Sequence, residues 1–218
     1  MPGTPTAAEF AADVLALAGS AELIPDAAAQ AERLGNLVRQ RWSQPQRSYH
    51  DARHLGECLT AYDLLADRAN PGYPLGRVAL WYHDAVYEPA RADNEAASAC
   101  LAEADLSELG MPSAPLEQVA RLILETTDHA LPLAGSPSAW VHDADLWILS
   151  APADRFDAYC AQVRSEYAAV PDAAYRLGRS QILGDLAGRP TLYAEPLARA
   201  EWEPRARANL ARELARLS

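Results

Sequence analysis

A histidine and an aspartate stand side by side, as His83-Asp84, inside the apolar and aromatic run Trp81–Tyr87. These neighbours indicate that the segment is largely buried. A buried carboxylate is costly unless it is paired, hydrogen-bonded or bound to a metal. The adjacent imidazole offers a second ligand for the same ion. We therefore interpret His83-Asp84 as one half of a metal site.

Three further residues are candidates for the other half of that site. His50 and His54 are four residues apart and would share one face of a helix. Asp145 lies in another apolar segment with helical spacing. Each residue alone also fits a structural role, such as a hydrogen-bonded core histidine or a capping aspartate. Together they favour a closed cluster of two imidazoles and two carboxylates from three helices. Mixed nitrogen and oxygen ligation suits Mn, Fe, Co, Ni or Zn, as one ion or a carboxylate-bridged pair.

The overall composition excludes several classes of function. The chain has 218 residues and a formal net charge of -11, which disfavours binding to a nucleic-acid polymer. A small phosphorylated substrate, held by a metal and a few arginines, remains compatible with that charge. All 19 basic residues are arginine, so no lysine is present for a Schiff base, for pyridoxal phosphate or for a Walker loop. The sequence also has no GxGxxG and no GxSxG.

The cysteines and the N-terminus predict a cytoplasmic protein. Cys58, Cys100 and Cys160 are far apart, odd in number and without a CxxC motif, which favours free thiols in a reducing compartment. The N-terminus lacks the pattern of a signal peptide. No apolar run reaches the roughly 18 residues that a membrane span requires. We expect no membrane partner.

Apolar residues recur at helical spacing, and no convincing period-two strand is found. The sequence predicts an all-α, single-domain protein of about ten helices over residues 1–218. The metal site lies in a core of about 40–150, with helices of 151–218 packing on it. Ser48 is expected to cap the third helix. The helices are expected at about 6–18, 25–42, 49–69, 75–87, 94–107, 115–128, 139–149, 153–169, 172–187 and 197–217.

Three of these segments resemble the motifs of the HD-domain superfamily. Tyr49–His54 resembles its YHNxxH segment, Trp81–Asp84 its HD doublet, and Asp143–Leu146 its final aspartate motif. The nearest resemblance is to the predicted metal-dependent HD phosphohydrolases, which are short, stand-alone bacterial proteins. It covers most of residues 40–212. Weaker matches outside the metal motifs are Asn94-Glu95, Thr126–His129, Arg164–Tyr167, Gly178-Arg179 and Glu203–Leu210.

The resemblance implies that His54, His83, Asp84 and Asp145 bind the metal, with Asp84 as the bridge if there are two ions. It implies that His50 protonates the leaving alkoxide. Asp51 departs from the pattern, which usually has asparagine there, and this leaves the hydrogen bonding of His50 open. Asp143 competes with Asp145 for the ligand role. Asp145 is preferred because the ligand of the superfamily usually precedes an aliphatic residue directly.

Further residues are candidates for binding the substrate. Arginine forks can hold phosphate bidentately, and Arg164, Arg179 and Arg207 are the candidates for this role. His129, at a predicted helix end, and Glu95, after the loop that follows the doublet, are candidates beside the metals. Each of these residues also has a structural interpretation, such as an arginine in a surface ion pair or a histidine stabilised by a helix dipole.

The sequence therefore predicts a metal-dependent phosphohydrolase that cleaves a small phosphoester, with nucleotides among the candidates, by metal-activated water. In this mechanism, His50 and Asp84 are the catalytic residues. One alternative is an HD-fold di-iron oxygenase, for which His129 and His142 would both have to serve as further ligands. A second alternative is a non-catalytic protein that binds a metal or a nucleotide.

Overall fold

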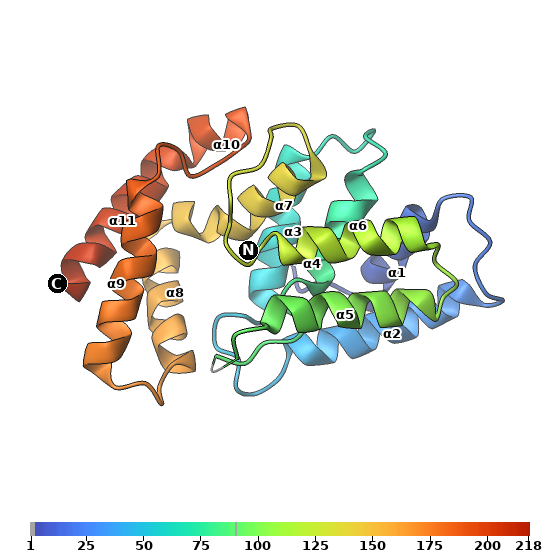
Figure 1. The fold of residues 1–218 in the computed structure, drawn as a ribbon, viewed down its shortest axis with the longest axis horizontal. Helices are drawn as coiled ribbons and strands as arrows, with labels where there is room; N and C mark the ends of the chain where they lie inside the picture. The colour runs from blue at the N-terminus through green and yellow to red at the C-terminus, as the bar shows by residue number, and fades with distance from the viewer. Residues whose placement is uncertain (1–2, 90) are drawn as a thin grey trace.

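The computed structural model describes residues 3–89 and 91–218 of the chain (Figure 1). Within these ranges the chain forms α-helices, one 3-10 turn and no strand, which confirms the all-α prediction. The elements are α1 (Ala7–Ala18), α2 (Ala27–Trp42), α3 (Ala52–Leu65), α4 (Tyr73–Tyr82), α5 (Asn94–Ser107), α6 (Ser113–Leu124), α7 (Pro137–Asp145), the 3-10 turn (Leu146–Ser150), α8 (Ala153–Glu166), α9 (Asp172–Gly188), α10 (Pro196–Glu201) and α11 (Glu203–Leu217).

The buried apolar residues form two adjoining clusters. The first comes from α1 to α7 and includes the fully buried Trp42, Tyr62 and Trp81. The second comes mainly from the 3-10 turn and α8 to α11, around Phe156 and Tyr193. Figure 1 shows α8, α9 and α11 on one side of the molecule and α1, α2, α5 and α6 on the other, with α7 between them. Residues from both groups of helices line one shared cavity.

A buried ion pair joins the two groups of helices. Arg155 on α8 donates from Nε and from Nη2 to the two carboxylate oxygens of Glu57 on α3, at 2.6 and 2.7 Å. Both side chains are buried. A bidentate pair with this geometry satisfies both charges and fixes the direction of each side chain. It therefore holds α8 in register with the helix that carries His54.

The expected helix over 49–69 begins later than predicted. Its N-cap is Asp51, not Ser48, because the Asp51 carboxylate accepts hydrogen bonds from the amides of Arg53 and His54 at 2.9 and 3.2 Å. A carboxylate at this position satisfies amides that have no partner within the helix. His50 consequently lies before the helix, and the prediction that His50 and His54 share a helix face is wrong.

Other predicted helices also have different boundaries, such as the one over 115–128, which ends as α6 at Leu124, so that His129 does not lie at a helix end. The segment over 75–87 ends as a helix at Tyr82, so that His83 and Asp84 lie in the turn that follows. The segment over 139–149 changes to a 3-10 turn after Asp145. The segment over 197–217 is two helices, because Pro204 occupies the first turn of α11 and cannot lie inside a longer helix. In the described ranges, none of the helices combines the length and the apolar character that a membrane span needs.

Candidate metal centre

The side chains of His54, His83, Asp84 and Asp145 meet at one point. The Nε2 atoms of His54 and His83 are 3.3 Å apart. Asp145 Oδ1 lies 3.3 Å from His54 Nε2 and 3.4 Å from His83 Nε2. Asp84 Oδ2 lies 3.3 Å from His83 Nε2 and 3.7 Å from His54 Nε2. The residues come from α3, from the turn after α4 and from the end of α7.

This spacing fits the donor atoms of a single transition-metal ion. Donors bound about 2.1 Å from an ion lie roughly 3.0–3.4 Å from one another in tetrahedral or octahedral geometry. Most of the separations in the cluster fall in this range or slightly above it. The set of two imidazoles and two carboxylates is also the mixed set that such ions take. Of the residues predicted from the sequence as ligands, His54, His83 and Asp145 belong to a group that could hold a metal ion, and Asp84 lies beside it.

A backbone contact fixes the orientation of one imidazole. His83 Nδ1 lies 2.8 Å from the Leu80 carbonyl oxygen, which can only accept a hydrogen bond, so Nδ1 carries the proton. The other nitrogen, Nε2, points at the cluster and offers its lone pair to a cation when its proton is displaced. Metal-binding histidines commonly have such a second hydrogen bond, since it fixes both tautomer and ring direction. The turn after α4 therefore presents His83 in a ligating form.

Cys58 is an additional donor, which was predicted from the sequence only as a free thiol. Its Sγ lies 3.5 Å from His54 Nδ1 and 4.0 Å from Asp145 Oδ1. One ligand atom each from His54, Cys58, His83 and Asp145 can be chosen so that all four lie within 4.8 Å of one another. Burial raises the pKa of Cys58 well above its usual value. The signal was available in the sequence, because Cys58 follows His54 by one helical turn.

The charges in the cluster compensate one another. Burial lowers the pKa of His83, but the carboxylates of Asp84 and Asp145 outweigh that effect and raise it well above the usual value. Burial raises the pKa values of Asp84 and Asp145, but the facing His83 imidazole brings both below the ordinary carboxyl range. The carboxylates therefore stay ionised beside a positive charge, as they would beside a bound cation.

His50 lies at the edge of the cluster and is held by a buried carboxylate. Its Nδ1 is 2.7 Å from Oε2 of Glu166, the last residue of α8. The other Glu166 oxygen accepts the backbone amides of Ser48, Tyr49 and His50 at 2.8 to 3.0 Å. Burial raises the pKa of Glu166, but the hydrogen bonds from His50 and these amides lower it to about 2.

Glu166 thus orients His50, a role that was not predicted from the sequence although Glu166 lies within the matched segment 164–167. The His50 ring also stacks on Tyr87, with centroids 3.9 Å apart, and the Tyr87 hydroxyl donates to Glu166 at 3.1 Å. Asp51, the departure from the motif, is occupied as a helix cap. The hydrogen-bond partner of His50 therefore comes from α8, more than a hundred residues away in the sequence.

Arg47 is a second residue for which the sequence predicted no role at the site. Its guanidinium is buried and donates to the carbonyl oxygens of His50 and Asp84 at 2.8 Å and of Ala85 at 3.0 Å. It thereby ties the loop before α3 to the turn after α4. The cluster and the His50 side chain are therefore positioned by one shared arginine. No pattern in the sequence separates Arg47 from the other arginines.

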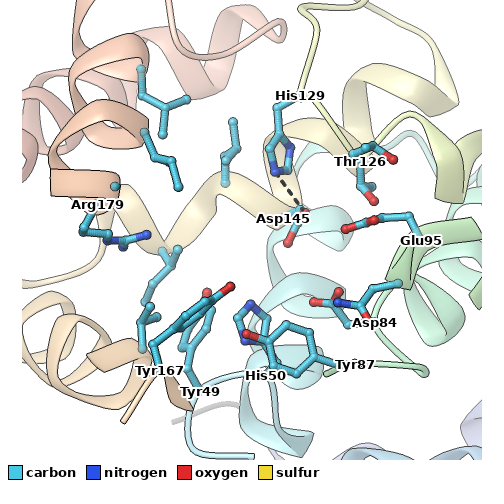
Figure 2. A pocket seen from close by; sticks show the side chains of 18 of the residues that line it. Tyr49, His50, Asp84, Tyr87, Glu95, Thr126, His129, Asp145, Tyr167 and Arg179 are labelled. Carbon is cyan, nitrogen blue, oxygen red and sulfur yellow. Dashed lines mark ion pairs between the residues drawn. The ribbon is translucent and has the colours of Figure 1, made fainter. Parts of the chain in front are cut away.

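The cluster opens into a cavity of about 750 Å³. Figure 2 shows Asp84, Asp145, Glu95, Thr126 and His129 along one side of it and Arg179 on the other. His129 Nε2 is 3.9 Å from Asp145 Oδ2, while its Nδ1 is buried and has no hydrogen-bond partner in the described chain. Burial lowers the pKa of His129, which favours the neutral imidazole. The cavity has the size of sites that hold drug-sized ligands.

The remaining predicted substrate residues divide into two groups. Glu95, His129 and Arg179 line the cavity. Arg164 and Arg207 are not among the lining residues. The Arg164 guanidinium donates to the carbonyl oxygens of Tyr167 and Val170, and that of Arg207 to those of Ala187 and Arg189. The geometry therefore favours structural roles for these two arginines, which fix the turns at both ends of α9.

The neighbours His142 and Asp143 on α7 are occupied away from the cluster. Asp143 is fully buried and accepts the amides of Ala194 and Glu195 at 2.8 and 2.7 Å. His142 Nδ1 bonds Asp143 at 2.7 Å, and its Nε2 lies 3.2 Å from the carbonyl oxygen of His129. Both ring nitrogens of His142 therefore have protein partners. Of the two competing aspartates, Asp145 is the one beside His54 and His83.

Comparisons with family models, with curated proteins and with solved structures found no match. The resemblance to HD-domain proteins therefore rests on the three short motifs and remains a prediction. The structure itself shows, in the described residues, an all-helical fold with a cluster of histidine, cysteine and aspartate side chains that could hold a metal ion.

Proposed function

We propose that this protein is a metal-dependent phosphohydrolase that cleaves a small phosphoester with water. The observation that carries the proposal is the convergence of two histidines and two aspartates beside a cavity, which His54, Asp84 and Asp145 line together with His50. A buried cluster of this kind beside a partly polar cavity is a typical arrangement for metal-assisted hydrolysis. The metals that suit the donors are Mn, Fe, Co, Ni and Zn, as one ion or two.

In the proposed mechanism, His54, His83, Asp84 and Asp145 hold the cation, with Cys58 as a neighbouring donor. A bound divalent cation supplies Lewis acidity, which makes water more nucleophilic and draws charge from the phosphoryl oxygens. Asp84 also lines the cavity, so its carboxylate can accept a proton from water that attacks the ester. The fixed positions of the ligands keep the reacting groups aligned.

His50 supplies the proton that the leaving oxygen needs. Because Glu166 accepts a hydrogen bond from Nδ1, the imidazole is held in one orientation with Nε2 left for the substrate. The protonated imidazole is the form that donates, and the hydrogen bond to Glu166 keeps its ring in place. After donation, the neutral ring keeps its bond to Glu166 and can be reprotonated by water.

The oxygenase alternative is less well supported by the geometry. It requires His129 and His142 as additional ligands, and both ring nitrogens of His142 are occupied by protein groups. The cluster offers two histidines directly, with His129 next to Asp145 as a third. We therefore favour hydrolysis over oxygen chemistry.

The test is metal analysis of the purified protein, followed by a panel of phosphomonoesters and phosphodiesters with that metal added. We expect phosphate release or diester cleavage that depends on the metal. Asp84→Ala should lose both the metal and the activity, since it removes a ligand from the cluster. Full retention of both by Asp84→Ala would refute the site, and a metal-loaded protein that cleaves no ester would refute the reaction.

A further inference from the structure

The cavity extends well beyond the metal cluster, and its far wall differs in character from the near one. The near wall carries the imidazoles and carboxylates. The far wall comes from the 3-10 turn, α8, α9 and the turn between them, and most of its side chains are apolar or aromatic. It is lined by Leu146, Ile148, Leu149, Tyr159, Val163, Tyr167, Val170, Tyr175, Ile182 and Leu186. A phosphate group alone would leave this wall uncovered.

Three charged residues of α9 and its C-terminal end, Arg179, Asp185 and Arg189, also line the cavity. Arg179 on α9 donates from Nη2 to the Tyr159 hydroxyl, and its guanidinium lies over the Tyr159 ring at 5.0 Å from the centroid. Its Nε is buried and has no hydrogen-bond partner in the described residues. Among the residues that the structure describes, no carboxylate lies within ion-pair distance of Arg179. A partly buried guanidinium without an anion and with an unused donor is costly.

Arg179 differs from the other arginines near the cavity in the partners of its guanidinium. Arg164, Arg189 and Arg207 each donate to backbone carbonyl oxygens and so have structural partners. Arg91 pairs with Asp93 at the surface. Only at Arg179, among these arginines, does a donor atom remain buried and unused. Arg179 therefore lines the cavity with a tyrosine hydroxyl as its hydrogen-bond partner and no anion beside it, which leaves the guanidinium available to an anionic ligand.

We propose that the substrate carries, in addition to its phosphoester, a flat or apolar body that ends in a second anionic oxygen group bound by Arg179. The proposal rests on the proposed function, because it assigns the phosphoester end to the metal cluster. Guanidinium groups bind carboxylate and phosphate oxygens with directed, charge-assisted hydrogen bonds. Figure 2 shows Arg179 across the cavity from Asp84 and Glu95, with Tyr49 and Tyr167 along the wall between them.

A matched pair of ligands without phosphorus tests this assignment independently of hydrolysis. Binding of 3-(4-hydroxyphenyl)propanoate and of 4-propylphenol to the full chain is measured by titration calorimetry. The two compounds share the aromatic body and differ in the carboxylate. We expect the carboxylate to bind the wild type at least about tenfold more tightly, the size of one charge-assisted hydrogen bond. Arg179→Gln should reduce this ratio to about one.

Two further variants serve as controls for the guanidinium group and for its position. Arg179→Lys keeps the positive charge without the guanidinium fork and should leave an intermediate ratio, which also shows that the wall tolerates substitution. Arg205→Gln removes an exposed arginine of α11 that lies outside the cavity and should change nothing. Equal binding of the two ligands by the wild type, or an unchanged ratio in Arg179→Gln, would overturn the proposal. The proposal would also be overturned if Asp145→Asn lost the preference for the carboxylate ligand and Arg179→Gln kept it. The carboxylate would then bind at the metal cluster.

The corresponding phosphate esters distinguish failure of the inference from failure of the function. In the metal-loaded protein, 4-(2-carboxyethyl)phenyl phosphate should have a KM at least about tenfold below that of 4-propylphenyl phosphate, with similar kcat. Cleavage of both esters with equal KM would remove the Arg179 assignment and keep the phosphohydrolase. Carboxylate binding that depends on Arg179, without cleavage of any ester, would keep the anion site and remove the reaction.

Discussion

At the scale of single residues, Asp143 and Asp145 show how two neighbouring carboxylates acquire different roles. They are two positions apart on α7, so they point to different faces of the helix. Asp143 binds the amides of Ala194 and Glu195 and fixes the segment before α10. Asp145 lies beside both clustered imidazoles. The two residues therefore form a matched pair for testing the ligand assignment.

We expect Asp145→Asn and Asp143→Asn to have opposite effects. Asp145→Asn removes a charged donor and should abolish stoichiometric metal binding in the purified protein. Asp143→Asn should keep the metal and lower the free energy of unfolding by about 1–3 kcal/mol, because buried amides lose a charged acceptor. Metal analysis and urea unfolding measure the two effects. A metal-free Asp143→Asn that folds normally would reverse the assignment.

His50→Ala should separate chemistry from metal binding. His50 contacts Glu166 and Tyr87 rather than the clustered carboxylates, so the variant should keep its metal. Loss of a general acid should lower kcat by about 10²- to 10⁴-fold for esters with poor leaving groups. Nitrophenyl esters, whose leaving groups need no proton, should be nearly unaffected. Equal slowing of both kinds of ester would argue against proton donation, and loss of the metal would make His50 a ligand.

At the scale of elements, Glu166 links the end of α8 to the loop that precedes α3. Its side chain is fully buried, and its pKa of about 2 lies below the ordinary value of 4.5. A carboxyl whose pKa is lower in the folded state stabilises the fold above its unfolded pKa. That stability is lost as the pH falls from about 4.5 towards about 2. The junction of α8 with this loop should therefore weaken in acid.

Glu166→Gln tests this contribution. Between pH 7 and pH 4, the ionised Glu166 should account for about 1 kcal/mol of the decrease in the free energy of unfolding. The variant should be less stable than the wild type at pH 7, and the difference should shrink by that amount at pH 4. Urea unfolding at both pH values gives the comparison, with the exposed Glu117→Gln on α6 as a control. A difference that stays constant with pH would show that the fold does not lower the pKa of Glu166.

Helical periodicity identified the elements well but not all of their ends. The prediction for 94–107 agrees with α5, since local propensity and apolar spacing are present in the sequence itself. The ends near the site depend on distant partners. The segment before α3 is held by Glu166 on α8, which accepts its backbone amides, and the end of α4 places His83 where its ring reaches a backbone carbonyl. Such contacts cannot be read from local patterns.

In the candidate site, too, some roles follow from local sequence and others depend on contacts between distant residues. The clustering of His54, His83, Asp84 and Asp145 was predictable, because a buried carboxylate and its neighbouring imidazole require a partner wherever they occur. Arg47 and Glu166 were not, because their roles depend on which backbone groups the fold leaves without partners. Arg164 and Arg207 match the resemblance at the level of sequence, yet the fold uses both on carbonyl groups at the ends of α9.

At the scale of the whole molecule, the proposed cation joins parts of the chain that are far apart in sequence. Its ligands come from α3, the turn after α4 and the end of α7, and these elements also share the first apolar cluster. Arg155 and Glu57 connect that cluster to α8. A cation bound only by the folded chain therefore stabilises the entire fold by mass action.

We expect Mn²⁺ at about 100 times its Kd to raise the free energy of unfolding by about 2.7 kcal/mol. For a chain of this size, that corresponds to a rise in Tm of roughly 5–10 °C. Asp145→Asn should show no such rise, whereas Asp143→Asn should show the full rise from a lower starting Tm. Ca²⁺ at the same concentration should have little effect, because the imidazole donors disfavour it. An equal shift in Asp145→Asn would place the stabilising ion elsewhere on this acidic protein, and the proposed centre would then lose its support.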